Sequence, residues 1–308
     1  MSLVPRIIYV SASLDSNLND NQKAVKDAIF QKLKDNDLEP WGFKKHGPLR
    51  KGWGFKEANE AMQKCQGAIV LAFAQWSCRG LGPRKRQNGF TPSEGNHFEG
   101  GLAMAHEVPL LVIKEEGTLD RGVLTKSAGH TVVEMPRDSS ADWVNTNQDF
   151  INDFDTWVKD VKENPRVFLG YCSAAKAVAG KIIRHLRRKY KLPVCDYAKD
   201  FRPGLTILDG ISKAAQECSY GVFLFTKDDK LSTSGGMLAS PRDNVIFEAG
   251  YFMHAKGKER VLIVKEKGVK MPADIGGNIY INLNSRNDIP AIYDQIEQFF
   301  TQQQETVK

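Results

Sequence analysis

The sequence lacks any long apolar run. No stretch approaches the roughly 18 consecutive apolar residues that a membrane-spanning helix needs, and residues 1–6 lack the apolar core of a signal peptide. No predicted strand is followed by Gly-x-Gly-x-x-Gly, and there is no P-loop. These absences argue against a membrane protein, a redox enzyme that uses a dinucleotide, and an ATPase. We therefore expect a soluble, cytoplasmic protein with no membrane partner.

Cysteine and histidine are also sparse. The five cysteines are an odd number, and Cys65, Cys172 and Cys218 lie in or beside strand-like runs, which favours reduced structural thiols. His97 and His106 share a predicted helix, but they are not four residues apart, and no cysteine pair has metal-ligand spacing. The sequence thus predicts neither a disulfide framework nor a metal site.

The positive charge is modest, at +6 for 308 residues, and it is spread along the chain. Its densest run, residues 181–191, also contains Ile182, Ile183 and Leu186 at helical spacing. This pattern is typical of an amphipathic helix whose basic side chains face solvent. We do not expect nucleic acid as a partner.

The most informative feature is an internal repeat. Four segments of the first half recur in the same order in the second half: 6–13 with 166–173, 62–73 with 215–225, 96–105 with 244–253, and 108–117 with 260–268. Asn164-Pro165 interrupts a helical pattern between the two sets. We therefore predict two copies of one fold, at residues 1–163 and 164–308.

Within each copy, short apolar strands alternate with helical patterns. The predicted strands are 7–11, 68–73 and 109–114 in the first copy, and 166–171, 220–226 and 260–265 in the second. Strands that are apolar throughout and separated by helices predict an α/β fold with a doubly wound parallel sheet in each copy. Residues 74–95 and 227–243 form unusually long connections, which favours a lid, a binding loop or disorder.

One acid in each copy lies inside an otherwise apolar segment. These are Glu99 and Glu248, each on a helix that follows one of the long connections. In doubly wound sheets, ligands bind beyond the carboxyl ends of the strands, so both acids are catalytic candidates. The alternative is that they only stabilise helix starts: Asn96 and Glu99 have capping-box spacing, and a first-turn carboxylate gains about 0.3–1 kcal/mol from the helix dipole.

One serine follows the first predicted strand in each copy. Ser13 and Ser173 are candidates for binding a phosphate or ribose through hydroxyl and backbone N–H groups. Serine is also a common cap of the next helix, so a structural role remains open for both.

The second half resembles the bacterial TIR-like nucleotide-binding domains. The resemblance rests on segments 166–170, 225–229, 241–252 and 270–276, above all on the box Arg-x-Asn-Val-Ile-Phe-Glu-x-Gly-Tyr-Phe. The first half is similar to a more divergent TIR-like or nucleoside deoxyribosyltransferase-like domain, mainly through residues 96–101. The resemblance implies tandem flavodoxin-like folds and a glutamate that supports cleavage of an N-glycosidic bond in NAD or a related nucleotide.

By that resemblance Glu248 is the catalytic acid, with Arg242 and Asn244 as nucleotide-binding neighbours. Glu99 and Asn96 are the matching candidates in the first copy. A single carboxylate suffices for this chemistry, because the nicotinamide of NAD is already cationic and leaves as a neutral ring without being protonated. NAD would be the substrate, and no cofactor is expected.

Three hypotheses follow. The first is an NAD-consuming N-glycosidase that serves as a bacterial anti-phage defence effector and forms a homo-oligomer when active. The second is a sensor that binds a nucleotide signal, such as a cyclic nucleotide, without cleaving it. The third is a scaffold whose TIR-like surfaces only assemble partners.

Overall fold

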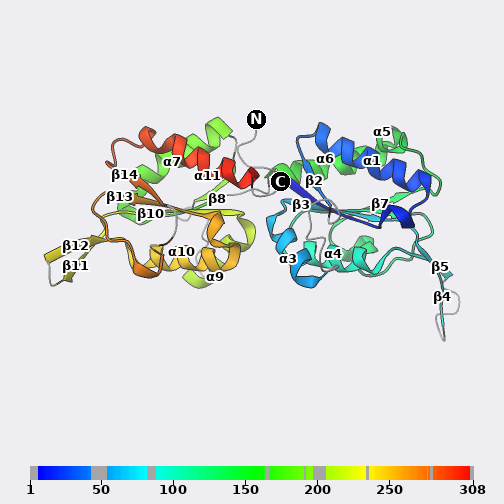
Figure 1. Ribbon diagram of the computed structural model, residues 1–308, viewed down its shortest axis with the longest axis horizontal. Helices are drawn as coiled ribbons and strands as arrows, with labels where there is room; N and C mark the ends of the chain where they lie inside the picture. The colour runs from blue at the N-terminus through cyan, green and yellow to red at the C-terminus, as the bar shows by residue number, and fades with distance from the viewer. Residues whose placement is uncertain are drawn as a thin grey trace. The chain divides into compact units, whose positions relative to one another are not determined.

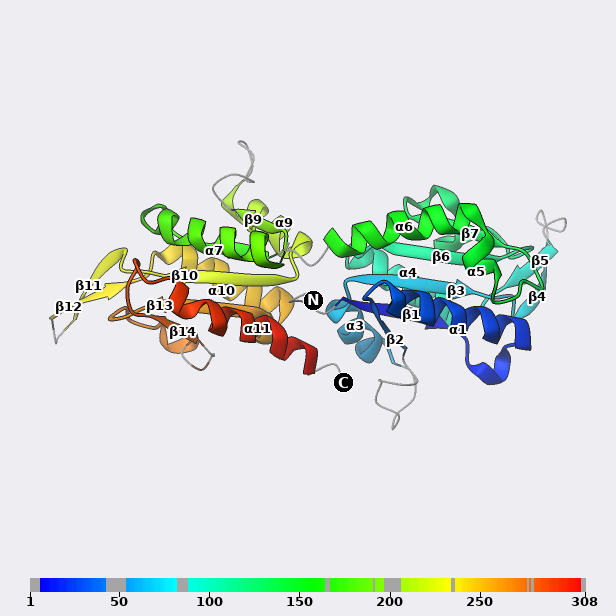
Figure 2. The same ribbon diagram turned by 90° about the horizontal axis from the view of Figure 1, so that it is seen from above.

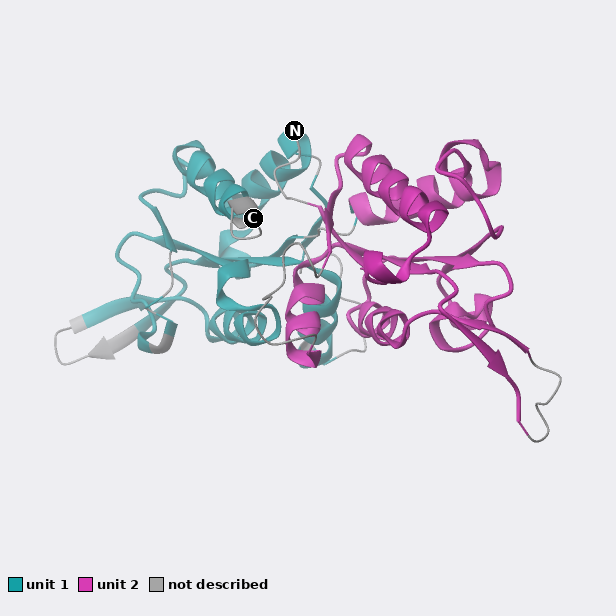
Figure 3. Cartoon of the chain, turned by 45° about the vertical axis from the view of Figure 1, so that its right-hand side comes forward, with its two compact units in different colours: residues 1–5, 163–308 teal, residues 6–162 magenta. Residues whose placement is uncertain are grey.

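The computed structural model describes residues 6–42, 54–81, 88–163, 167–190, 192–196, 206–233, 236–275, 277 and 280–305. The chain divides into two compact units, residues 6–162 and residues 163–308, which Figure 3 colours magenta and teal. The domain boundary predicted from the sequence lies one residue later, between residues 163 and 164. Within the described ranges, no helix has both the length and the apolar character needed to cross a membrane.

The first unit is built on a five-stranded sheet of order β2-β1-β3-β6-β7. Its strands are β1 Ile7–Ala12, β2 Glu39–Trp41, β3 Gly67–Ala72, β6 Leu110–Glu115 and β7 Thr131–Met135, all paired in parallel. Its helices are α1 Asp20–Asp35, α3 Phe55–Lys64, α4 Glu94–Ala105, α5 Trp143–Thr146 and α6 Gln148–Glu163. Helices α1, α5 and α6 cover one face of the sheet, while α3 and α4 cover the other (Figure 1).

The second unit repeats this arrangement with a sheet of order β14-β13-β10-β8-β9. Its strands are β8 Val167–Gly170, β9 Val194–Asp196, β10 Tyr220–Phe225, β13 Val261–Glu266 and β14 Tyr280–Leu283, again all parallel. Helices α7 Lys176–Tyr190 and α11 Tyr293–Glu305 cover one face, and α9 Ile207–Glu217 and α10 Asp243–Lys256 cover the other (Figure 1).

Numbered within its own unit, each sheet has the strand order 2-1-3-4-5, which is that of flavodoxin-like folds. The central strands β3 and β10 are buried along their whole length, as parallel strands covered on both faces must be. The structure therefore confirms the predicted fold class, two tandem flavodoxin-like doubly wound parallel-sheet domains.

The basic run near residue 181 lies on α7. Val178, Ile182, Ile183 and Leu186 are buried, while Arg187 and Arg188 are exposed. The predicted amphipathic helix is thus confirmed up to residue 190; Lys191 lies outside the described residues.

The two long connections contain strands that the sequence did not predict. In the first unit β4 Trp76–Arg79 pairs antiparallel with β5 Asn88–Thr91, and in the second unit β11 Asp229–Thr233 pairs antiparallel with β12 Gly236–Ser240. Figure 2 shows each hairpin extending beyond its own sheet. We call the second hairpin, residues 229–240, the arm. Isolated bridges, Phe90 to Thr118 and Ala239 to Val269, attach each hairpin to the loop after β6 or β13.

Candidate functional site

Glu248 lies on the inner side of α10, over the end of β8. It is 3% exposed, and within the described ranges no hydrogen-bond partner reaches its Oε2. A methyl group at Gly170 would lie 2.8 Å from that oxygen and 2.5 Å from the Phe223 ring. Because Gly170 is the last residue of β8, this carboxylate oxygen is held near the carboxyl end of the sheet.

Burial raises the pKa of Glu248 from its usual 4.5 to about 7. A charged carboxylate is costly in a buried position where one of its oxygens has no hydrogen-bond partner among the described residues. Near neutral pH the side chain is therefore divided between its protonated and ionised forms, which is typical of a functional acid or base.

Glu99 occupies the matching place on α4 but has a partner. It is 7% exposed, and its Oε1 accepts a hydrogen bond of 2.7 Å from the hydroxyl of Tyr9 on β1. Burial, with the nearby Glu99 carboxylate, raises the pKa of Tyr9, so this hydroxyl stays protonated and able to donate. The two acids thus share a position but differ in hydrogen bonding.

Strand register explains the difference. Ile8 pairs with Gly67 and Val167 pairs with Tyr220, and the repeat aligns Gly67 with Tyr220. The residue after Val167 is Phe168, so Phe168 takes the place of Tyr9 in the second unit. Its ring stacks on Phe252 of α10 at 4.9 Å and has no hydroxyl to donate.

Neither acid caps its helix. The N-caps of α4 and α10 are Ser93 and Arg242, and neither side chain makes a capping hydrogen bond. Glu99 and Glu248 lie in the second turn, at the same sequence distance from these caps. The alternative in which both acids only stabilise helix starts is therefore not supported.

Asn96 and Asn244 do not take matching places. Asn96 stands three residues before Glu99, whereas Asn244 stands four residues before Glu248. Asn96 is 1% exposed and donates to Ser11 Oγ at 2.9 Å and to Ser11 O at 3.3 Å, while Asn244 is exposed at the start of α10. Asn96 therefore holds α4 on β1, and only Asn244 leaves its side chain accessible to a ligand.

The remaining predicted residues lie around the carboxyl ends of the strands. Arg242 forms an ion pair of 3.1 Å with Asp229, the first residue of the arm. Ser13 is 8% exposed, and its hydroxyl has no partner among the described residues, whereas Ser173 is exposed in the turn after β8. Binding of a nucleotide by Ser13, Ser173, Arg242, Asn244 and Asn96 stays a prediction.

A second acid in each unit escaped the sequence prediction. Glu115 ends β6 and accepts from the Ala74 backbone N–H at 2.7 Å, and Glu266 ends β13 and accepts from the Lys227 backbone N–H at 2.9 Å. Each acid thereby fixes the first turn of chain after the neighbouring central strand. The signal was present, because the repeated segments 108–117 and 260–268 both carry a Lys-Glu pair.

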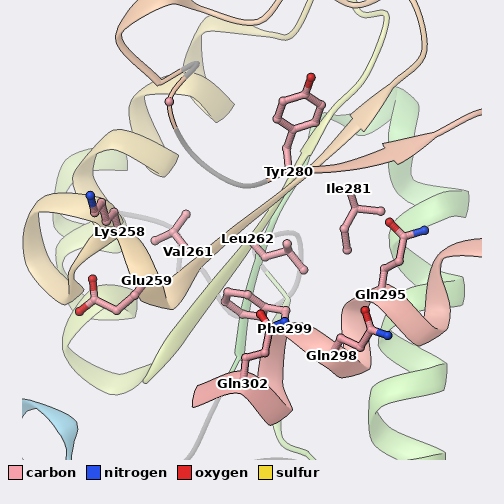
Figure 4. Close-up of a pocket in the computed structure, with 11 residues that line it drawn as sticks. Lys258, Glu259, Val261, Leu262, Tyr280, Ile281, Gln295, Gln298, Phe299 and Gln302 are labelled. Atoms are coloured by element: carbon pink, nitrogen blue, oxygen red, sulfur yellow. The ribbon is translucent and has the colours of Figure 1, made fainter. Parts of the chain in front are cut away.

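A separate pocket of about 440 Å³ lies at the opposite end of the second sheet. It is bounded by the first residues of β13 and β14 and by one side of α11, with Val261, Tyr280 and Gln298 in its wall (Figure 4). None of the predicted site residues lines it. Among the described residues, no group of three or more histidine, cysteine or acidic side chains is placed to hold a metal ion.

Comparison with known proteins is consistent with this architecture. Residues 166–285 match the family model described as CAP12/Pycsar effector protein, TIR domain. CD-NTase-associated protein 12 of Sphingobacterium faecium is 31% identical over 113 residues, which cover 36% of this chain and 34% of that protein. Pycsar effector protein BcPycTIR of Burkholderia cepacia is 29% identical over 141 residues, which cover 45% of this chain and 44% of that protein.

The chain thus spans less than half the length of these relatives. Among solved structures, tagatose-6-phosphate ketose/aldose isomerase from Escherichia coli aligns over 99% of this chain and 83% of its own, at 13% identity. The TM-score of this alignment is 0.28. The sequence resemblance in the second half is confirmed: residues 166–285 of this chain form a bacterial TIR-like domain.

Proposed function

We propose that the TIR-like domain cleaves the N-glycosidic bond between nicotinamide and ribose in NAD or a related nucleotide. The observation that carries this proposal is Glu248 itself, a buried acid beside the carboxyl end of β8 with one oxygen that has no partner among the described residues. A carboxylate that only stabilised the fold would be expected to accept hydrogen bonds, as Glu99 and Glu266 do.

The chemistry requires an ionised carboxylate near the anomeric carbon. As the bond to nicotinamide breaks, the ribose gains oxocarbenium character, and a fixed negative charge stabilises it. The pKa of about 7 leaves free Glu248 only partly ionised at neutral pH. A cationic nicotinamide riboside moiety beside it favours the ionised form, so the substrate itself promotes the active state of the acid.

Access to Glu248 requires a local rearrangement, because only 3% of the residue is exposed. Asp229 of the arm forms a half-exposed ion pair with Arg242 at the start of α10, so the arm lies beside the helix that carries Glu248. We propose that this rearrangement occurs when copies of the chain associate. Turnover per molecule should then rise with protein concentration.

In this proposal the first domain binds or regulates and does not cleave. Its acid is engaged by Tyr9. The relatives are named as a CD-NTase-associated protein and as a Pycsar effector, which supports a role in bacterial anti-phage defence, triggered by a nucleotide signal. The protein would act in the cytoplasm.

The test is nicotinamide release from NAD, measured by mass spectrometry at high protein concentration. Glu248→Gln should lower turnover by about 10²–10³-fold, because it removes the developing charge interaction and keeps the shape of the side chain. Glu99→Gln is the matched control and should stay within about twofold of wild type. Unchanged turnover in Glu248→Gln would refute the assignment.

A second candidate function is a nucleotide sensor without catalysis. Ser13 favours it, because its buried hydroxyl at the carboxyl end of β1 has no partner among the described residues, and a bound ligand would supply one. Calorimetry with intact NAD and with cyclic nucleotides distinguishes the two functions. Binding with no product over hours would support the sensor and contradict the glycosidase.

A further inference from the structure

Arg286 connects four segments at the carboxyl end of the second sheet. It lies between β14 and α11, and its Nε and Nη2 donate to Glu266 Oε2 at 3.0 and 2.8 Å. Nη1 donates to the carbonyl of Ala174, next to Ser173, at 3.3 Å, and Nη2 donates to the carbonyl of Lys227 at 3.5 Å. One guanidinium therefore joins the loop after β8, the loop after β10, the end of β13 and its own segment.

The acids around Arg286 extend this network to the arm. Asp228 has a fully buried side chain, accepts from the Thr226 hydroxyl at 2.9 Å, and lies 3.8 Å from Arg286 Nη2. Its backbone N–H also donates to the carbonyl of Ser240, the last residue of the arm, at 3.1 Å. We call Asp228 and Ser240, where the hairpin begins and ends, the root of the arm. The root is thus part of the same hydrogen-bonded cluster.

Charge makes this cluster strong. Burial alone would raise the pKa of Glu266, but hydrogen bonds from Arg286 and from the Lys227 N–H outweigh it and lower the pKa. The hydrogen bond to Glu266 in turn raises the pKa of Arg286. Both groups are therefore ionised at neutral pH, and their hydrogen bonds are charge-assisted.

In the first unit, the matching acid at the end of the strand is bound, among the described residues, by a neutral side chain and not by a cation. Glu115 takes the place of Glu266, but its side-chain donor is the neutral amide of Gln22 on α1, at 2.9 Å. Gln22 fixes one helix to one strand end, whereas Arg286 also contacts the loops after β8 and β10. The extra contacts in the second unit fall on the segments that carry Ser173 and the root of the arm.

We propose that Arg286 is a positioning residue for nucleotide binding: it holds the loops after β8 and β10 in the arrangement that the ligand of the TIR-like domain requires. This inference rests on the proposed function of that domain. Arg286 itself acts through Glu266, Ala174 and Lys227 and takes no part in bond cleavage.

The experiment compares Arg286→Gln, Arg286→Lys and the control Arg188→Gln in the full chain. Arg188 is an exposed arginine of α7, outside the site. In Arg286→Gln, amide hydrogen exchange at Lys227 should be about tenfold faster, and the KM for NAD should rise about tenfold with kcat within about threefold. Arg286→Lys keeps the charge but not the planar fork, so it should restore part of each effect. The control should match wild type.

Two results would overturn the inference. One is unchanged exchange at Lys227 in Arg286→Gln; the other is a fall in kcat with no change in KM, which would place Arg286 in the bond-breaking step. Failure of the proposed function would give a different result, because wild-type protein would then release no nicotinamide. In that case exchange at Lys227 and calorimetry with intact NAD still decide whether Arg286 holds a nucleotide-binding arrangement.

Discussion

The two units carry a glutamate at the same place in the same fold, yet the hydrogen bonding of the two side chains differs. Glu99 accepts a hydrogen bond from Tyr9, whereas Glu248 lies with Phe223 beside Gly170 and has an oxygen without a partner among the described residues. The strand order and the position on the helix are unchanged. The comparison teaches that one side chain on the neighbouring strand decides whether a buried carboxylate in this position has a hydrogen-bond donor.

The surroundings strengthen that difference. One turn after each acid stands Ala103 in the first unit and Phe252 in the second, and both are fully buried. Phe252 stacks on Phe168 and lies edge-on to Phe223, so aromatic rings occupy the space near Glu248. Aromatic packing stabilises the second core and at the same time withholds hydrogen-bond donors from the acid.

The largest expected effect is on the free energy of unfolding, which should change in opposite directions when Glu248 or Glu99 is replaced by glutamine. Folding raises the pKa of Glu248 from 4.5 to about 7, so the folded state is penalised as pH rises through that window, and the full penalty applies above pH 7. Glu248→Gln should therefore raise the free energy of unfolding by up to about 3 kcal/mol at pH 8 and by little at pH 4. Glu99→Gln should lower it by about 1 kcal/mol, because the Tyr9 hydroxyl then donates to a neutral amide.

Chemical denaturation from pH 4 to pH 8 measures both variants. A gain in stability together with a loss of nicotinamide release is the expected signature of a strained functional acid in Glu248→Gln. If both variants lost stability equally at every pH, the two acids would be equivalent and the comparison would fail.

The central strands of each sheet could be predicted from the sequence, whereas the edge strands could not. The continuous apolar runs of β3, β6, β10 and β13 predicted those strands because a strand covered on both faces must be apolar throughout. The edge strands β2, β7, β9 and β14 were not predicted. They have three to five residues each, which is too short for a clear pattern, and β2, β7 and β14 each include exposed residues that interrupt the apolar run.

The next effect tests the packing beside each acid. Gly170→Ala should lower the free energy of unfolding by about 2 kcal/mol, because the new methyl group meets Phe223 and Glu248 Oε2, and it should also reduce nicotinamide release. The counterpart in the first unit is Ser11→Ala, which removes an acceptor of Asn96 and should cost about 1 kcal/mol with turnover unchanged. Loss of turnover in Ser11→Ala, measured in the same assay, would show that the first unit takes part in cleavage.

A third prediction concerns Tyr9. Tyr9→Phe gives the first unit the ring found at Phe168 and removes the donor to Glu99 Oε1, which should lower the free energy of unfolding by about 1.5 kcal/mol. Nicotinamide release should remain at the wild-type level. A gain of turnover that disappears in the Tyr9→Phe, Glu99→Gln double variant would mean that the hydroxyl alone silences the first unit.

The site was less predictable than the fold, for a physical reason. Sequence spacing located Glu99 and Glu248 on their helices. The residues opposite them, Tyr9 and Phe168, come from strands far away in the sequence, and their register could not be derived from the sequence alone. The two asparagines illustrate the same point. A one-residue difference in spacing turns Asn96 onto β1 and leaves Asn244 exposed.

The smallest expected effect concerns Arg242. Its ion pair with Asp229 is half-exposed, so Arg242→Ala should change the free energy of unfolding by less than about 0.5 kcal/mol, and by less still in 0.5 M salt. The affinity for NAD, measured by calorimetry, should fall more than the stability does if Arg242 binds the nucleotide as we propose. The matched variant Ser93→Ala removes a donor to Asn96 at the start of α4 and should leave NAD affinity unchanged. A loss of stability above 1 kcal/mol in Arg242→Ala, without a loss of affinity, would make the ion pair a structural link between the arm and α10 and would remove Arg242 from the nucleotide site.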